Sequence, residues 1–286
     1  MIPTEDIISI VKNTITASIK CNTNRGYIGW SSCDNICMDM HDCLDMCAET
    51  LEMRGYMVAL EADTYILVSG VKLASHADSS SGMLTDVIMC TYELIEKCVK
   101  EVEKQDKQMR DQALALIIKE AKKSVFDGWT GWRYDLLKSV ICLCDEKSAK
   151  KLEKVLDTLL EISREDYYPE YTKKEDLIVR YLLHRHLYGK KNTQKELYQN
   201  IAINELRIIA IKDAMEDKNY DEAEKLCLEK ANAEETWHYH SSDPEDWNNV
   251  LYDIYKTANN TEKQIAQAKK LLLRGNETVS YTHLTL

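Results

Sequence analysis

The sequence predicts an all-α protein, an α-solenoid of antiparallel helix pairs with irregular repeats. Only 9 Gly and 3 Pro occur in 286 residues, which leaves little material for the turns of β-rich folds. Charged residues make up 30% of the chain, and both signs alternate along it, as expected for solvated helix faces. Apolar-periodic segments separated by tight breaks complete the pattern, so we expect helices that pack against their neighbours in the chain.

The pairing is clearest near the C-terminal end. One helix ends at Asp217-Lys218-Asn219 and the next spans 220–231, and a further pair spans 247–258 and 261–273. This pattern resembles a tetratricopeptide-type repeat, although the interval of 41 residues from Tyr220 to Thr261 exceeds the ~34 of that repeat. Such pairs cannot bury their apolar faces alone, so they stack into solenoids whose surfaces bind other proteins.

The other helices follow from apolar spacing between breaks, chiefly those at 77–82, 126–129 and 167–169. We expect helices over 4–20, 31–54, 56–76, 84–98, 106–125, 132–144, 149–162, 177–188, 195–200 and 204–216, followed by the three named above. This gives an N-terminal helical bundle or set of repeats over 1–126. Tetratricopeptide-like repeats follow over 127–276, and 277–286 is expected to be a non-native or disordered tail.

Several residues predict helix ends. Ser31 or Ser32 is expected to cap the second helix, and Gly55 to end it as the glycine after the C-cap. Thr261-x-x-Gln264 has the spacing of a capping box, and Asp243-Pro244 is a second start signal. The motif Gly55-Tyr56-x-x-Ala59 matches Asn219-Tyr220-x-x-Ala223, with a small residue where a partner helix can approach closely.

Charge and hydropathy exclude several classes of function. The net charge of −11 argues against a protein that coats nucleic acid, because phosphate binding needs a concentrated positive patch. No segment reaches the ~20 apolar residues that span a bilayer. Residues 1–6 include acids and lack a basic or apolar signal region. We therefore expect a cytoplasmic protein that does not bind membranes.

Ten cysteines occur, and most occupy apolar positions of helical patterns, where a reduced thiol behaves as a small hydrophobe. The strongest metal candidate is one helix with four thiols and an imidazole: Cys33, Cys37, His41, Cys43 and Cys47. Thiols and imidazoles bind zinc, but structural zinc sites usually draw ligands from a turn as well as a helix. Core packing is therefore favoured over metal binding.

Three further Cys and His pairs predict no metal site. Cys142-x-Cys144 has no second pair downstream, and His184 and His186 diverge on a helix. His238 and His240 precede Asp243 in an expected loop, where solvated histidines are the commoner outcome. We expect no cofactor.

Three aromatic residues, Trp129, Trp132 and Tyr134, lie around Gly128 and Gly131, and Arg133 lies among them; these form the aromatic cluster. Exposed aromatic residues beside an arginine are typical of a protein-binding hot spot. Large aromatic side chains also pack joins between helix pairs, and this structural role is favoured here. The four residues are nevertheless the candidate protein-binding site. The sequence contains no Gly-rich phosphate loop, GxSxG or HExxH motif, so we do not expect an enzyme.

Several segments together resemble the helical region that accompanies SWIM-type zinc fingers in bacterial proteins. The matching stretches are Arg25-Gly26-Tyr27-Ile28, Arg54-Gly55-Tyr56-x-x-Ala59-Leu60, Ser81-Gly82-x-Leu84-x-Asp86-Val87-Ile88, Phe126-Asp127-Gly128-Trp129-x-x-Trp132-Arg133, Leu251-Tyr252-Asp253-Ile254-Tyr255 and Thr261-Glu262-Lys263-Gln264-Ile265. The finger of that family is C-x-C followed by C-x-H. This chain has no C-x-H, and its only C-x-C is Cys142-x-Cys144, so no zinc or DNA role is carried over.

The last eight residues, 279–286, resemble translated sequencing adapter joined to an incomplete gene. We expect a chain that begins after a finger and is cut within its repeats. An uncapped C-terminal repeat would then expose an apolar face and favour self-association.

The function predicted from these features is a non-enzymatic protein-interaction scaffold, whose partner docks on the repeat surface. One alternative is an accessory region of a nucleic-acid-associated zinc-finger protein, which a basic face would favour. The other is a metal-dependent enzyme that uses the Cys/His helix, which stoichiometric zinc would favour.

Overall fold

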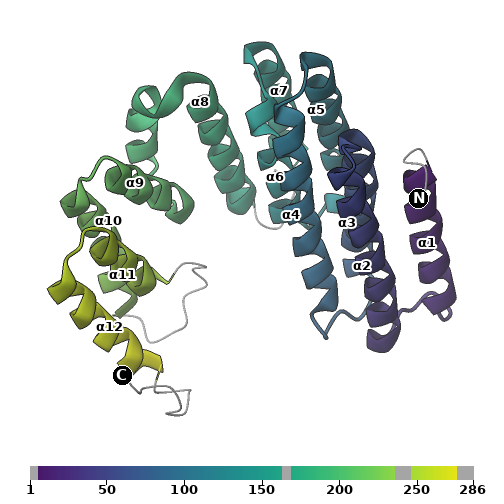
Figure 1. Cartoon of the computed structure of the whole chain (residues 1–286), viewed down its shortest axis with the longest axis horizontal. Coiled ribbons are helices and arrows are strands. Elements are labelled where there is room, and N and C mark those ends of the chain that lie inside the picture. Colours follow the sequence, from purple (N-terminus) through teal and green to yellow (C-terminus); the bar gives the residue numbers. More distant parts are fainter. Residues whose placement is uncertain (1–5, 163–168, 236–245, 276–286) are drawn as a thin grey trace. The chain divides into compact units, whose positions relative to one another are not determined.

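The computed structural model describes residues 6–162, 169–235 and 246–275, and the prediction of an all-α protein is confirmed in them (Figure 1). Their regular secondary structure is helical, apart from the isolated β-bridges Asn24–Tyr27 and Ile28–Ala77. The α-helices are α1 Ile7–Asn22, α2 Trp30–Glu52, α3 Tyr56–Ala74, α4 Met83–Glu103, α5 Lys107–Ala121, α6 Thr130–Lys138, α7 Glu146–Ile162, α8 Pro169–Gln199, α9 Asn204–Glu216, α10 Tyr220–Glu235, α11 Trp247–Thr257 and α12 Thr261–Gly275. Two 3-10 turns, η2 Ser124–Phe126 and η3 Ile141–Leu143, flank α6.

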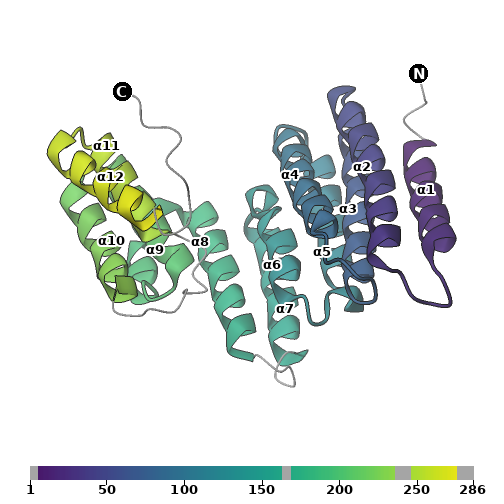
Figure 2. The same cartoon turned by 90° about the horizontal axis from the view of Figure 1, so that it is seen from below.

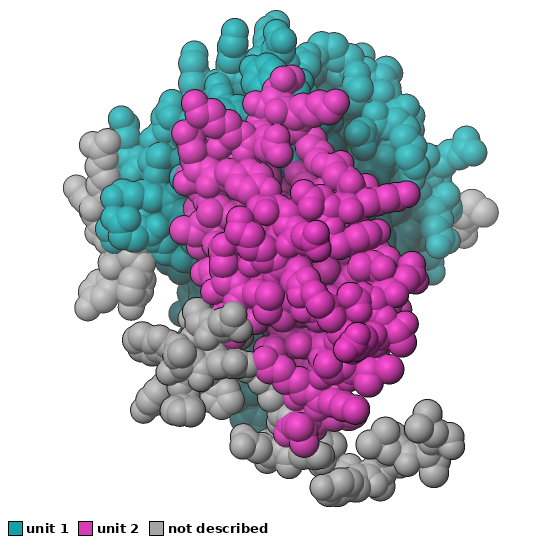
Figure 3. All heavy atoms as spheres, turned by 90° about the vertical axis from the view of Figure 1, so that its left-hand side faces the viewer, with its two compact units in different colours: residues 1–189 teal, residues 190–286 magenta. Residues whose placement is uncertain are grey.

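The chain divides into two compact units, residues 1–189 and 190–286 (Figure 3). The division falls inside α8, where Gly189 has φ 80° and ψ 166° and interrupts the helix. Only glycine adopts this backbone region readily, so residue 189 separates two helical segments. The helix expected over 177–188 ends at this glycine, but a helical segment resumes directly after it and runs to Gln199. The predicted domain boundary at 126/127 lies between η2 and α6, inside the first unit.

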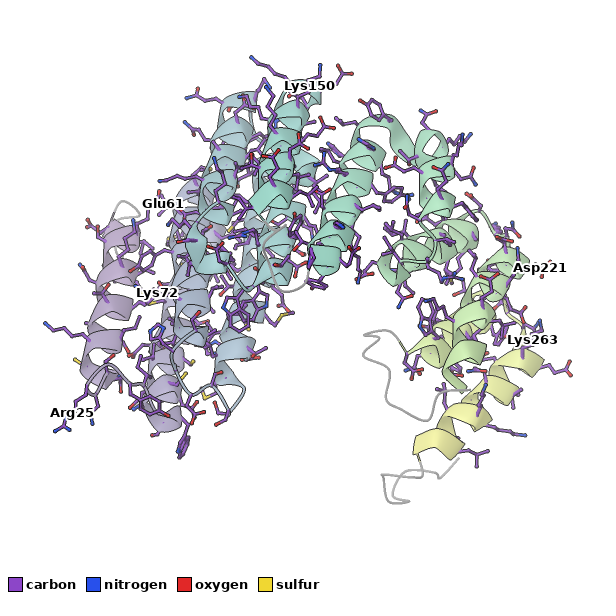
Figure 4. The ribbon with its side chains drawn as sticks, turned by 180° about the vertical axis from the view of Figure 1, so that it is seen from behind. Arg25, Glu61, Lys72, Lys150, Asp221 and Lys263 are labelled. Carbon is purple, nitrogen blue, oxygen red and sulfur yellow. The ribbon has the colours of Figure 1, made fainter. Side chains whose placement is uncertain are left out.

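Helices of the first unit lie side by side largely in chain order, with α1 at one edge (Figures 1 and 2). From α1 to α6 each helix packs against its successor and, in several cases, against the next helix but one: α3 contacts α1, α2, α4 and α5. At Gly70 of α3, a Cβ atom would lie 3.3 Å from the Ile88 side chain of α4, so the missing side chain permits this close approach. An ion pair of 3.4 Å joins Lys12 of α1 to Glu61 of α3; Figure 4 labels Glu61.

In the second unit, α9 packs on α10, α10 on α11 and α11 on α12. Trp247 of α11 is fully buried, and Cys227 of α10 donates a 3.2 Å hydrogen bond to its carbonyl oxygen. Lys263 of α12, labelled in Figure 4, pairs with Glu224 of α10 at 2.7 Å. Contacts in this unit, like those in the first, are therefore made between helices close in sequence.

Three helix pairs share one turn geometry. The residue after each C-cap has positive φ: 66° at Arg54, 59° at Lys218 and 55° at Asn259. The following amide donates back to a carbonyl five residues earlier, at 2.9 Å for Gly55, 2.8 Å for Asn219 and 3.0 Å for Asn260. This is the Schellman arrangement, which satisfies the carbonyls at the helix end. It joins α2 to α3, α9 to α10 and α11 to α12.

The same turns correct two predicted helix ends. Gly55 does not hold the left-handed position, because its φ is −80° and Arg54 occupies that position instead. The capping box at Thr261 is also wrong: the Asn260 side chain accepts from the Lys263 amide at 3.2 Å, and Gln264 donates to Tyr252. In both cases the residue with the expected chemistry lies one position away from the predicted one.

Other predicted helix boundaries also differ from those in the structure. Gly29 is the N-cap of α2, not Ser31 or Ser32. The expected helix 132–144 is two shorter elements, α6 and η3, and the expected helix 177–188 begins at Pro169. Asp246, and not the start signal at 243–244, caps α11 by accepting from the Asn248 amide at 3.0 Å; residues 243 and 244 lie outside the described residues.

All ten cysteines are free thiols, and seven of them are buried, as the helical pattern predicted. Cys33, Cys37, Cys43 and Cys47 form the inward stripe of α2, each with 0–1% of its surface exposed. Burial raises the pKa of Cys37 to about 12 and that of Cys43 to about 11. These thiols therefore remain protonated near neutral pH and pack as small apolar groups.

One buried polar group lies in the middle of the same core. Asp63 of α3 has no exposed surface, and neither of its carboxylate oxygens has a hydrogen-bond partner in the described part of the chain. Burial raises the pKa of this carboxyl well above its usual range, so the folded protein favours the protonated form. Cys47 of α2 and Cys98 of α4 lie close to Asp63: burial raises the pKa of both thiols, and a negative charge on Asp63 would raise it further.

Helices in the ranges 6–162, 169–235 and 246–275 all lack the combination of length and apolar character that crossing a lipid bilayer requires.

Asp63 predicts a specific dependence of stability on pH. Because its pKa is higher in the folded than in the unfolded chain, its contribution is fully present below about pH 4 and is lost as pH rises towards the folded pKa. The free energy of unfolding falls by up to about 1.4 kcal/mol per pH unit in this window. In the Asp63→Asn variant this fall disappears, as urea denaturation at pH 5, 6.5 and 8 would measure. The control is Asp45→Asn, on the exposed face of α2, for which the pH dependence should match wild type.

Candidate interaction surface around α6

The aromatic cluster predicted from sequence surrounds the start of α6. Gly128, with φ 83°, turns the chain after η2, and α6 begins two residues later. The rings of Trp129 and Trp132 stack with centroids 4.3 Å apart and planes inclined by 14°. Trp129 Nε1 also donates a 3.2 Å hydrogen bond to Ser75 Oγ at the end of α3. Both tryptophans are half-buried, so their stacked rings present a partly exposed aromatic surface.

Arg133 points inward. It is only 8% exposed, and its guanidinium donates to the carbonyl oxygens of Ala121 and Lys123, both at 3.1 Å, and to Asp127 Oδ1 at 2.6 Å. The two carbonyls lie at the C-terminal end of α5 and just beyond it, where a cation is favoured by the helix dipole. Arg133 therefore anchors the end of α5 to α6.

Tyr134 is buried with 1% of its surface exposed, and its hydroxyl has no hydrogen-bond partner in the described residues. Burial raises the pKa of this phenol, and the negative charge of Asp176 raises it further by a smaller amount. The structure thus brings the four predicted residues together at one helix. Only Trp129 and Trp132 remain accessible to a partner.

A groove that sequence reasoning missed lies on the next turns of α6. It has a volume of about 510 Å³ and is lined mainly by apolar side chains from α4, η3 and α8, with polar residues of α6 along one wall. The lining residues are Met89, Tyr92, Glu96, Val99, Lys100, Asp135, Lys138, Ser139, Ile141, Cys142, Leu182 and His186. Tyr92 joins the groove to the aromatic cluster, because its hydroxyl donates a 2.6 Å hydrogen bond to the Trp132 carbonyl oxygen.

The α6 wall of the groove is fixed by charge. Lys138 donates to Asp135 at 2.9 Å and to Glu175 of α8 at 2.8 Å. Burial lowers the pKa of Lys138, but these two carboxylates outweigh it and raise the pKa overall, so the side chain stays charged. His186 of α8 also lines the groove, and its Nε2 lies 3.0 Å from the Cys144 carbonyl oxygen. The five lining residues of α4 follow helical spacing, but no sequence signal joins them to the lining residues of the other three elements.

The remaining metal candidates have varied environments. His184 lies 3.6 Å from Glu153 of α7, whereas His186 faces the Cys144 carbonyl, so the two histidines diverge as expected. Cys142 is half-buried and lines the groove, and burial raises its pKa to about 11. His238 and His240 lie outside the described residues. His41 leaves the buried thiol stripe of α2 and faces α4, where it meets Asp86.

No family model, no curated protein and no solved structure matches this chain. The resemblance to the region beside SWIM-type fingers accordingly stays a prediction.

The inward orientation of Arg133 predicts a loss of stability on its removal. Arg133→Ala leaves two carbonyl groups near the end of α5 without their donors and should lower the free energy of unfolding by about 1–3 kcal/mol. Urea denaturation followed by circular dichroism measures this loss. Lys119→Ala, on the exposed face of α5, should change stability by no more than about 0.5 kcal/mol. Equal stabilities of the two variants would contradict the anchoring role.

Proposed function

We propose that the chain is a non-enzymatic protein-interaction scaffold of the cytoplasm, built on stacked antiparallel helix pairs. The observation that carries this proposal is the open, apolar groove beside α6. Its volume of about 510 Å³ falls in the range of sites that hold one ligand or a few large side chains. The occupant we propose is a segment of another protein that inserts apolar side chains between α4 and α8.

Packing between near neighbours supports the repeat arrangement. Three helix pairs use the same left-handed turn, and most contacts join helices that are adjacent or next but one in the chain. In repeat proteins each helix pair buries its apolar face on the next pair and leaves an extended surface. We therefore propose an irregular tetratricopeptide-like solenoid, in which the groove is one part of the binding surface.

The composition of the groove favours a protein partner. Tyr92, Val99 and Ile141 give it an apolar floor, which suits an inserted aromatic or aliphatic anchor. Lys100 and Glu96 are exposed at its rim and supply charges of both signs for polar contacts around that anchor. The partly exposed Trp129–Trp132 pair, next to Tyr92 through the Trp132 carbonyl, extends the same surface.

A second candidate function is the accessory region of a nucleic-acid-associated zinc-finger protein. The observation in its favour is a basic stripe on α7, where Lys147, Lys150, Lys151 and Lys154 are exposed; Figure 4 labels Lys150. Glu146, Glu153 and Asp157 lie on the same helix and reduce this positive charge. The groove therefore supports the scaffold better than the stripe supports nucleic-acid binding.

Substitutions at the groove rim test the scaffold. The Met89→Glu/Leu182→Glu variant places charges on the apolar walls and should reduce recovery of protein partners at least about tenfold, as for loss of an interface anchor. The experiment is capture from a nuclease-treated extract of the native host with the full chain as bait, followed by quantitative mass spectrometry.

Met38→Glu is the matched control, because Met38 on α2 is 51% exposed, Met89 is 53% exposed, and only Met89 lines the groove. Equal recovery by wild type and both variants would reject the groove. Loss of every partner on nuclease treatment, together with weakened capture by Lys150→Glu/Lys154→Glu, would favour the nucleic-acid-associated alternative.

We also propose that the chain self-associates through α12. Ile265 and Leu272, two turns apart on this helix, are 51% and 50% exposed, and Leu273 is 72% exposed. The partner that matches such a face is the same face of a second copy.

The variant Ile265→Glu/Leu272→Glu should therefore shift the mass measured by light scattering from dimer or larger towards monomer. Lys269→Glu, an exposed charge change on the same helix, should leave the mass unchanged. A monomeric wild type at about 100 μM, well above the Kd of a specific pair, would contradict this proposal.

A further inference from the structure

Three side chains with different donor atoms meet between α2 and α4. His41 comes from α2, and Asp86 and Cys90 come from α4. One ligand atom from each residue lies within 4.8 Å of the other two, and His41 Nε2 is 3.2 Å from Asp86 Oδ2. These residues stand apart from the groove and from the aromatic pair, and nothing in the proposed scaffold function uses them.

Regular helices hold this cluster in place. Asp86 and Cys90 are four residues apart on α4 and so lie on one face, one turn above the other. The N-terminal end of α4 is fixed by the Asp86 amide, which donates to the Gly82 carbonyl at 3.1 Å. The helix of His41, α2, packs against α4, and Cys47 of α2 lies close to Cys98 of α4. The three ligand atoms therefore converge without any contribution from a loop.

The donor set matches a borderline-soft divalent cation. Imidazole nitrogen, thiolate sulfur and carboxylate oxygen are the ligands of Zn²⁺, at about 2.0–2.3 Å from the metal. Two such ligands of a tetrahedral ion are about 3.5 Å apart, which is close to the 3.2 Å between His41 Nε2 and Asp86 Oδ2. The other separations are at most 4.8 Å and need to shorten by about 1 Å. A neutral imidazole, a thiolate and a carboxylate carry two negative charges together, which balance those of the ion.

Access and electrostatics also favour a cation here. The side chains of His41 and Asp86 are 35% and 68% exposed, so an ion can enter from solvent and keep water as its fourth ligand. The helix that carries His41 contains six carboxylates and no Lys or Arg, which concentrates cations at its surface. The carboxylates are Asp34, Asp39, Asp42, Asp45, Glu49 and Glu52.

The thiol distinguishes a metal site from a simple ion pair. Cys90 Sγ lies within 4.8 Å of the ligand atoms of both His41 and Asp86, and a thiol carries a proton in the absence of metal. A bound Zn²⁺ ion displaces that proton and converts the thiol to a thiolate ligand. Without a metal, His41 and Asp86 would form only an exposed ion pair, and Cys90 would have no role in it.

We propose that His41, Asp86 and Cys90 bind one Zn²⁺ ion and tie α2 to α4. The site has three protein ligands and an open position, so a bound water completes its coordination. It differs from the site considered from the sequence, because only His41 of the Cys/His helix takes part and the other two ligands come from a different helix.

Titration of the full chain with Co²⁺, a spectroscopic substitute for Zn²⁺, tests this site. We expect one equivalent of Co²⁺ to give a thiolate-to-cobalt charge-transfer band, and Zn²⁺ to abolish it by displacement. Cys90→Ser should remove the band, and His41→Gln and Asp86→Asn should each weaken binding at least about tenfold, as for loss of a ligand.

Cys21→Ser is the matched control, since Cys21 is an exposed thiol on α1, and it should leave the titration unchanged. Circular dichroism confirms that each variant keeps its helices; if Cys90→Ser does not fold, the exposed Asp86 variant carries the test. Absence of a stoichiometric band in wild type, or a band that persists in Cys90→Ser, would overturn the proposal.

Discussion

The fold depends on how each helix ends. The last carbonyl groups of an α-helix have no partner within it, and burying them without one is costly. Here a left-handed residue closes α2, α9 and α11, and the amide that follows satisfies a carbonyl of the finished helix while the next helix begins at once. Because this turn reverses the chain within two residues, it forces consecutive helices into antiparallel contact.

Basic side chains satisfy other carbonyls and add contacts between neighbouring helices, both where a left-handed turn joins them and where none does. Arg133 donates to the end of α5, and Lys190 donates to the Asp213 carbonyl of α9 at 2.9 Å. Arg207, buried in the second unit, donates to the Leu226 carbonyl of α10 at 2.8 Å. Arg133 and Arg207 can be buried, and Lys190 half-buried, because each charge is matched by carbonyl oxygens and by a nearby carboxylate. An arginine beside aromatic residues therefore need not belong to a binding surface.

The surfaces left for function follow from the same packing. The apolar groove lies where α4, α6 and α8 meet. Because α6 is short and is followed only by the 3-10 turn η3, side chains do not fill the space between these helices. Where α2 and α4 pack directly, their outer edges bring His41 beside Asp86 and Cys90. Both features are built from helices that are not consecutive in sequence, and both lie next to a well-packed core.

The sequence by itself determined the all-α class, most helix positions and the burial of the thiol stripe on α2, because helical periodicity is local and repeats every 3.6 residues. It did not determine which residue at a helix end takes the capping geometry. Arg54, and not Gly55, adopts the left-handed conformation after α2, and Asn260, and not Thr261, accepts the hydrogen bond at the start of α12. Only the tertiary structure turned Arg133 inward, left Asp63 without a partner and assembled the groove and the His41 cluster. Those arrangements depend on distances between separate helices, which no local pattern encodes.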